Sequence, residues 1–198
     1  MIRVGLLIGL LAVGAVPALA DRSTKALQCT YSSADRTNNL TRDWADFEFS
    51  TERRGGPMYY NSRHCYREAV QASRDWMKSK PVLTERQRAI TRFHMARNSA
   101  WAGDRKAAAS YAAMAIRQDQ PADAPLDWNT YVRGFHAYLV GDVGQLAASH
   151  AGLLKRGGEA NLINASVLAR CKKCIAEPFL IVTSDPRCSV ENPVSNRE

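Results

Sequence analysis

Two stretches in the middle of the chain repeat one helix–turn–helix pattern, and this repetition restricts the fold more than any other feature. Residues 84–118 carry apolar side chains at helical spacing on both sides of Gly103-Asp104. Residues 127–156 carry the same pattern around Gly141-Asp142, which lies 38 residues further along the chain. A helical pair repeated at about this interval is typical of a helical solenoid, with two unrelated hairpins as the alternative.

The register of the repeat predicts where its helices cross. The same offset carries Phe93 onto Tyr131 and Ala96 onto Gly134. Small residues at Ala96, Gly134 and Ala108 predict close approaches between helices. Five aromatic residues also lie at helical spacing: Trp101, Trp128, Tyr131, Phe135 and Tyr138. Such residues mostly belong to the core, although they can also line the concave surface of a solenoid.

The flanking segments also favour helices. The pattern predicts a first, degenerate pair at residues 40–52 and 59–78, and a last helix at residues 159–175 that caps the stack. The only β-rich run is residues 179–182, which is too short and isolated to form a sheet. The fold class is therefore all-α.

The first 20 residues have the pattern of a cleavable signal peptide. Arg3 is followed by an apolar run over residues 5–16, by Pro17, and by the small residues of Ala18-Leu19-Ala20. We expect cleavage after residue 20 and a periplasmic or secreted protein. No later run approaches the ~18 apolar residues of a membrane helix, so we expect no transmembrane segment after cleavage. The remaining chain divides into an arm (21–39), helical repeats (40–158), and a capping helix with a tail (159–198).

Export changes how the five cysteines are interpreted. They are Cys29, Cys65, Cys171, Cys174 and Cys188. In an oxidising compartment disulfides persist, and an odd number leaves at least one thiol unpaired in the chain. Catalytic thiols or a metal site are the alternatives for Cys171-Lys-Lys-Cys174, but no second CxxC and no nearby histidine support them.

Motifs for catalysis are missing from the sequence. It contains no G-x-S-x-G, phosphate loop, dinucleotide fingerprint or H-E-x-x-H. His94, His136 and His150 are candidate general bases, but His150 lies on a core stripe and His94 adjoins a core position. We therefore expect no enzyme, no catalytic residues, no cofactor and no metal site.

The charge is unevenly distributed. The chain has 27 Lys and Arg against 19 Asp and Glu. Residues 51–80 carry seven basic and three acidic side chains, and residues 84–118 carry seven and two, whereas residues 119–150 carry one and four. This pattern predicts either an ordinary solvated face or a basic docking surface. The candidate binding residues are Arg86, Arg88, Arg92 and His94. Export and the absence of a reading motif argue against nucleic acid, so we expect a protein or an anionic envelope component.

The repeat resembles the tetratricopeptide repeat (TPR), because Gly103, Ala108 and Ala115 occupy the positions of its turn glycine and packing alanines. The period of 38 departs from the usual 34. The chain from Cys65 to Cys188 looks more like a group of uncharacterised exported bacterial proteins built on such repeats. Four segments carry this likeness: residues 65–69, 93–103 and 128–132, and Cys174 with Pro178-Phe179 and Cys188.

The resemblance implies a fold and two disulfides, but no catalytic residues. The fold is a short TPR-like stack of two or three hairpins, with a capping C-terminal helix and a disulfide-tied tail. Cys174 and Cys188 match the group's two C-terminal cysteine positions, which leaves Cys29 to pair with Cys65. Cys171 remains free, with an exchange of Cys171 for Cys174 as the alternative.

The functional prediction is an exported protein-interaction module that presents a helical-repeat surface to its partner. The alternative is a small envelope hydrolase or enzyme accessory that uses His94 or a free cysteine.

Overall fold

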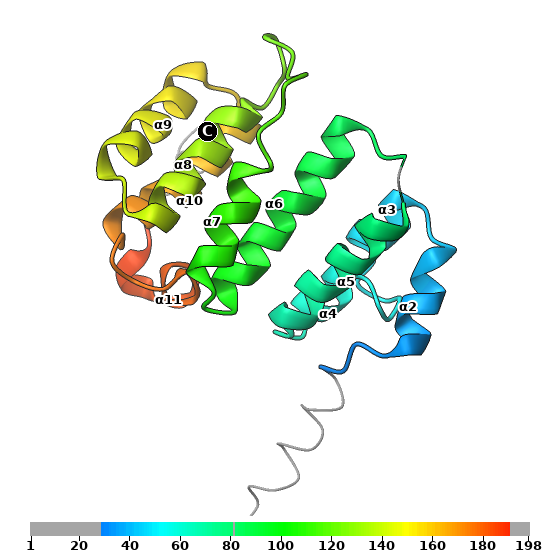
Figure 1. Ribbon diagram of the computed structural model, residues 1–198. Coiled ribbons are helices and arrows are strands. Elements are labelled where there is room, and N and C mark those ends of the chain that lie inside the picture. Colours follow the sequence, from blue (N-terminus) through cyan, green and yellow to red (C-terminus); the bar gives the residue numbers. More distant parts are fainter. Residues whose placement is uncertain (1–28, 81, 191–198) are drawn as a thin grey trace, which may run out of the picture.

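All regular secondary structure in the described residues, 29–80 and 82–190 of the computed structural model, is helical (Figure 1). The predicted all-α class is therefore confirmed. The predicted signal peptide, the start of the arm and the end of the tail lie outside the described residues. The helices are α2 (Ser33–Leu40), α3 (Trp44–Phe49), α4 (Pro57–Asn61), α5 (Tyr66–Ser79), α6 (Glu85–Trp101), α7 (Arg105–Ala113), α8 (Trp128–Val140), α9 (Val143–Arg156), α10 (Glu159–Lys173), α11 (Phe179–Ser184) and the 3-10 helix η1 (Pro186–Cys188).

From α5 to α10, each helix packs against the next one along the chain. Figure 1 shows α2 to α5 at one end, α6 and α7 in the middle, and α8 to α10 at the other end. Helix α11 packs on the preceding α10. Two contacts depart from the chain order, because α10 also packs on α8 and α11 also packs on α6. One hydrophobic cluster joins α6 to α11, and a second, smaller one joins α3, α4 and α5.

The two turns that the sequence aligns have the same geometry. Gly103 and Gly141 both adopt a left-handed conformation, with φ of 81° and 79°. Glycine is favoured there because it has no Cβ to clash with the backbone. Asp104 and Asp142 then cap α7 and α9, each accepting a hydrogen bond from the backbone N–H three residues later. Arg105 donates to the last carbonyls of α8, so the first turn is fastened to the second hairpin.

The predicted close crossing at Gly134 is confirmed. A Cβ at this position would lie 2.4 Å from Leu168 Cδ1 and 2.8 Å from Ser149 Cβ. Gly134 therefore lets α8 approach both α9 and α10. The corresponding Ala96 in α6 is completely buried, as is Ala108 in α7.

The N-terminal segment differs from the prediction. Ser33–Leu40 forms helix α2, which begins within the predicted arm of residues 21–39, because Ser32 and Asp35 make a reciprocal capping box at its start. Arg54 and Tyr60 both donate to the Asp35 carboxylate, and the Asn39 amide donates to a loop carbonyl. These bonds tie α2 to the first helices.

The predicted first pair is also broken into shorter pieces. The helix expected over residues 40–52 is only α3, and that expected over 59–78 is divided into α4 and α5. The division falls at His64, a non-glycine residue with φ of 59°. A disulfide between Cys29 and Cys65 anchors the chain directly after this residue. We refer to this bond as the N-terminal disulfide.

The run of residues 179–182 is helical, not extended. Phe179 and Val182 are buried one helical turn apart in α11, whereas Leu180 is 44% exposed. The apolar spacing therefore suits a helix that packs on α6 and α10. A disulfide between Cys174 and Cys188, the C-terminal disulfide, closes the loop around this helix. Both disulfides join the pairs that the resemblance implied.

Two helices of the predicted hairpins differ in detail from the prediction. Helix α7 ends at Ala113. The Asn129 side chain accepts from the Arg117 N–H and donates to the Arg117 carbonyl, so the backbone of Arg117 bonds to this side chain in place of continuing the helix. In α9, two of the apolar residues at helical spacing, Val143 and Leu154, are 59% and 42% exposed, although this spacing predicts a buried face. Leu146, Ser149 and Leu153 are the residues buried on this helix.

Candidate functional site

A hollow of about 550 Å³ lies where α5, the C-terminal end of α6 and α7 meet. Helix α5 supplies Arg67, Gln71 and Arg74 to its wall, α6 supplies Ser99, and α7 supplies Tyr111. The three α5 residues occupy positions i, i+4 and i+7, which places them on one face of the helix. We refer to this hollow, together with the side of α6 that carries Ser99, as the basic groove.

The arginines of α5 have no counter-ion within the described residues. Arg67 and Arg74 are exposed. Neither side chain forms an ion pair or a hydrogen bond in the described parts of the chain. Other arginines there pair with carboxylates, namely those of Asp35, Asp46, Asp75, Asp119 and Asp185. The acidic side chain on the wall, Asp104, is engaged in capping α7. The groove therefore carries an excess of positive charge.

The structure divides the four predicted binding residues between two faces of α6. Each residue of an α-helix is rotated by roughly 100° from the last, so Arg88, Arg92 and Ser99 lie on one stripe. Because Ser99 lines the basic groove, this stripe lies on the groove side of α6. Arg92 also donates to the Met114 carbonyl at the end of α7, at 3.0 Å. Arg88 and Arg92 therefore belong with the groove.

Arg86 and His94 lie on the other side of α6. Arg86 lines a hollow of about 470 Å³ together with Arg117 and Trp128. His94 faces α3, where its Nδ1 lies 2.6 Å from Glu48 Oε1. The predicted set thus does not converge on one surface.

Glu48 anchors a chain of buried polar contacts behind His94. Its side chain has no exposed surface. Glu48 Oε2 accepts from the Thr91 hydroxyl at 2.7 Å, and the Thr91 oxygen accepts from Trp44 Nε1 at 3.1 Å. A buried carboxylate is tolerated when such donors satisfy it. The contacts hold α3 on α6 and fix the ring of His94.

A second small hollow, of about 210 Å³, opens beside His94. It also contains Arg97, whose guanidinium lies 4.7 Å from the centre of the Trp101 ring. The Arg97 Nε is buried and has no hydrogen-bond partner in the described parts of the protein. We refer to this site as the His94 hollow.

Cys171 is in the protein core. It is completely buried within the cluster that joins α6 to α11. Burial raises the pKa of its thiol to about 12. A thiol held in its neutral form is a poor nucleophile, so the structure argues against Cys171 as a reactive cysteine.

The other two candidate bases lie apart from both sites. His150 is half-buried on α9, and burial together with Lys172 lowers its pKa. His136 lines a hollow between α7, α8 and α9. Neither contacts a carboxylate in the described residues.

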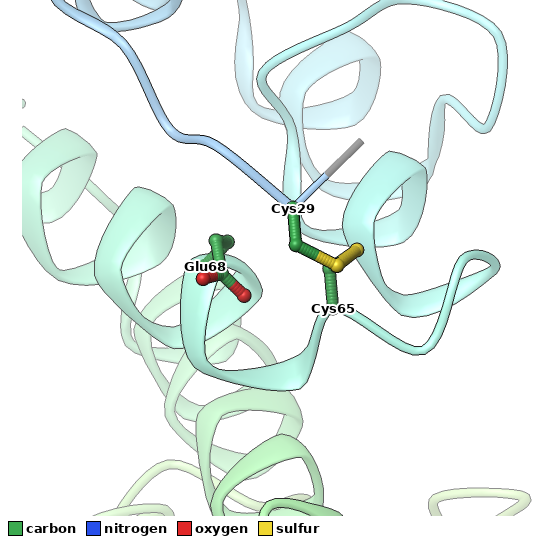
Figure 2. Close-up of side chains that lie close together, drawn as sticks. All are labelled: Cys29, Cys65 and Glu68. Carbon is green, nitrogen blue, oxygen red and sulfur yellow. A yellow bond between two sulfur atoms is a disulfide. The ribbon is translucent and has the colours of Figure 1, made fainter. Parts of the chain in front are cut away.

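One group of side chains has the proximity of a metal site but lacks free ligands. The ligand atoms of Cys29, Cys65 and Glu68 lie within 4.8 Å of one another. Figure 2 shows that the two sulfur atoms are joined to each other beside the Glu68 carboxylate. Because metals bind the thiolate, the disulfide removes both cysteines as ligands.

Comparison with known proteins gives no assignment. No family model matches the chain, and no curated protein or solved structure matches it either. Within the described residues, none of the helices is both long and apolar enough to span a bilayer.

Sequence reasoning missed four of the residues that form these sites. Arg67 and Arg74 lie in the basic stretch of residues 51–80, and their spacing of seven residues would have placed them on one helical face. Glu48 and Arg97 carry no comparable signal. Their roles depend on how α3 docks against α6, which local spacing does not encode.

Proposed function

We propose that this protein is an exported interaction module that binds an acidic segment of a partner protein in the basic groove. The observation that carries the proposal is the set of arginines along α5 and α6 that lack carboxylate partners in the described residues: Arg67, Arg74, Arg88 and Arg92.

The charges and the shape of the groove agree with such a partner. Arg67 and Arg74 project from one wall, and Tyr111 contributes an aromatic ring to the opposite wall. Arginine and tyrosine are both enriched at protein interfaces, where arginine pairs with carboxylates through two parallel hydrogen bonds. An acidic segment would supply the counter-ions that these arginines lack.

We further propose that α6 to α9 are two units of a TPR-like solenoid. The matched glycine turns, the aspartate caps that follow them and the packing of each helix on the next support this arrangement. Solenoids bind partners on extended surfaces between their helices. Export through the signal peptide of residues 1–20 agrees with the two disulfides, which persist in oxidising compartments.

Affinity capture of the tagged, exported protein with charge-reversed variants tests the proposal. The first variant combines Arg67→Glu with Arg74→Glu. The matched control combines Arg133→Glu with Lys155→Glu, which changes the net charge equally at exposed residues without an ion pair in the described chain. We expect one protein to be retained by the native chain and the control, and lost from the groove variant.

Two results would contradict the proposal. Equal loss from both variants would indicate a general effect of net charge. Retention of an anionic polymer instead of a protein, again dependent on Arg67 and Arg74, would assign the groove to an envelope component.

A hydrolase that uses His94 is a second candidate, favoured by the Glu48–His94 pair. A carboxylate that orients a histidine is a common arrangement for a general base. The His94 hollow has no Ser, Thr or Cys among its described lining residues, so water would have to be the nucleophile. Loss of function in His94→Gln with partner capture intact would favour this candidate.

A further inference from the structure

The His94 hollow has the features of a binding site for a small ligand, and it lies on a different face from the basic groove. It is bounded by the end of α3, by α4 and by the C-terminal half of α6. Its volume of about 210 Å³ is below the usual range of roughly 300–1,000 Å³ for drug-sized ligands. The site suits a molecule with a single ring or a short aliphatic group.

One side of the hollow is apolar. Phe49, Met58 and Trp101 line it, and Phe49 remains 48% exposed at its edge. The Phe49 ring meets the His94 ring edge to face, with 6.1 Å between their centres. An exposed aromatic side chain beside a concave site is a surface that an apolar group would cover.

The polar side of the hollow carries hydrogen-bonding groups that have no partner in the described residues. Since an ionised Glu48 can only accept, His94 Nδ1 must carry the hydrogen of their 2.6 Å contact. This leaves His94 Nε2 as the ring nitrogen available to a ligand, and it donates when the ring is protonated. The Asn98 oxygen accepts from the Asn61 amide at 2.6 Å, so the Asn98 amide nitrogen is also left to donate.

Arg97 supplies the permanent charge. It lies one turn after His94, is stacked on Trp101, and has no ion pair in the described residues. Glu48 forms no ion pair with Arg97 in the described residues, and its two oxygens accept from Thr91 and contact His94. An anionic group in the hollow would therefore meet an arginine that has no ion-pair partner in the described residues.

We propose that the His94 hollow binds a small carboxylic acid that carries an aromatic or aliphatic group. The carboxylate lies between His94 and Arg97, where it accepts hydrogen bonds from Arg97 and, when the imidazole is protonated, from His94 Nε2, and the apolar group lies against Phe49 and Trp101. Arginine is well suited to this role, because its planar donors match the two oxygens of a carboxylate.

The proposal can be tested by titrating the isotope-labelled full-length protein with 3-phenylpropionate. Two-dimensional nuclear magnetic resonance follows the titration. The neutral 3-phenylpropionamide has the same shape and is the matched control ligand. We expect the acid to shift the signals of His94, Arg97, Asn98 and Trp101, and we expect the amide to bind at least tenfold more weakly. Equal binding of the two compounds, or shifts elsewhere in the protein, would overturn the proposal.

Variants supply an independent measurement. Arg97→Met keeps an unbranched stem over Trp101 and removes the charge, so we expect at least tenfold weaker binding of the acid. His136→Gln, in a separate hollow, is the control and should bind as the native protein does. If Arg97→Met does not fold, the comparison of acid with amide on the native protein still decides the question.

A further arm distinguishes two sources of the same chemistry. A short peptide that ends in phenylalanine carries both a carboxylate and an apolar group. Tighter binding of the peptide than of 3-phenylpropionate would assign the site to chain ends, whereas the reverse would assign it to free acids. The variant with Arg67→Glu and Arg74→Glu should bind the acid normally, because the two sites lie on different faces.

Discussion

The close approach of three helices at Gly134 leads to a prediction with a defined sign and size. A Cβ at this residue would lie 2.4 Å from Leu168 Cδ1, and Leu168 is completely buried in α10. Gly134→Ala therefore forces either the Leu168 side chain or the whole of α10 to move by more than an ångström. Overpacking of a core costs about 1–3 kcal/mol, and this contact belongs at the upper end. Replacing glycine by alanine inside a helix regains about 1 kcal/mol, so we expect a net loss of about 2 kcal/mol.

Urea unfolding followed by circular dichroism measures this loss, which corresponds to about 4–8 °C in Tm for a chain of this size. Gly144→Ala in α9 is the matched control. Its Cβ would meet only Asp142 Oδ1, at an ordinary distance of 3.6 Å. The control should therefore raise the stability by up to about 1 kcal/mol. A Gly134→Ala protein as stable as the native one would refute the close packing of α8, α9 and α10.

Three further predictions concern cysteines and an aspartate. Because burial raises the pKa of Cys171 to about 12, a thiol reagent should label it only after unfolding in urea, and labelling of the native protein would contradict its burial. Replacing both cysteines of one disulfide by serine should lower the free energy of unfolding. We expect a loss of about 3 kcal/mol for the C-terminal disulfide and about 4 kcal/mol for the N-terminal disulfide, because the latter closes a longer loop. A larger loss at the shorter loop would contradict the chain-entropy argument. Burial alone would raise the pKa of Asp35, but hydrogen bonds from Ser32, Arg54 and Tyr60 outweigh it and hold this pKa below its usual value. The stabilisation by Asp35 should thus be complete above about pH 4, and it should be lost as the pH falls through the lower pKa of the folded state. In Asp35→Asn, the free energy of unfolding should therefore fall less steeply with decreasing pH in this acid range.

The helical pairs could be predicted from the sequence because their signals are local. Amphipathic spacing, the glycines at 103 and 141 and the aspartates that follow them fix where α6 to α9 begin and turn. The break between α4 and α5 has no such signal. It depends on a left-handed His64 and on the N-terminal disulfide, which joins residues 36 positions apart.

The candidate sites could be predicted only in part. The excess of basic residues in residues 51–118 predicts a basic surface, but the predicted binding residues on α6 lie on two faces, and the prediction does not include the α5 arginines. The contact between Glu48 and His94 joins residues 46 positions apart in sequence. Spacing along the chain cannot reveal such a pair, since it forms only when α3 docks on α6.

The most direct test of a partner in the basic groove is photo-crosslinking from within it. A photoreactive amino acid at Gln71, on the groove wall, would be compared with the same residue at His136, in the hollow between α7, α8 and α9. The proposal predicts one defined protein adduct from position 71 in exporting cells, with none from position 136, and its loss when Arg67 and Arg74 are changed to glutamate. The same adduct from both positions, or an adduct that survives the charge reversal, would contradict it.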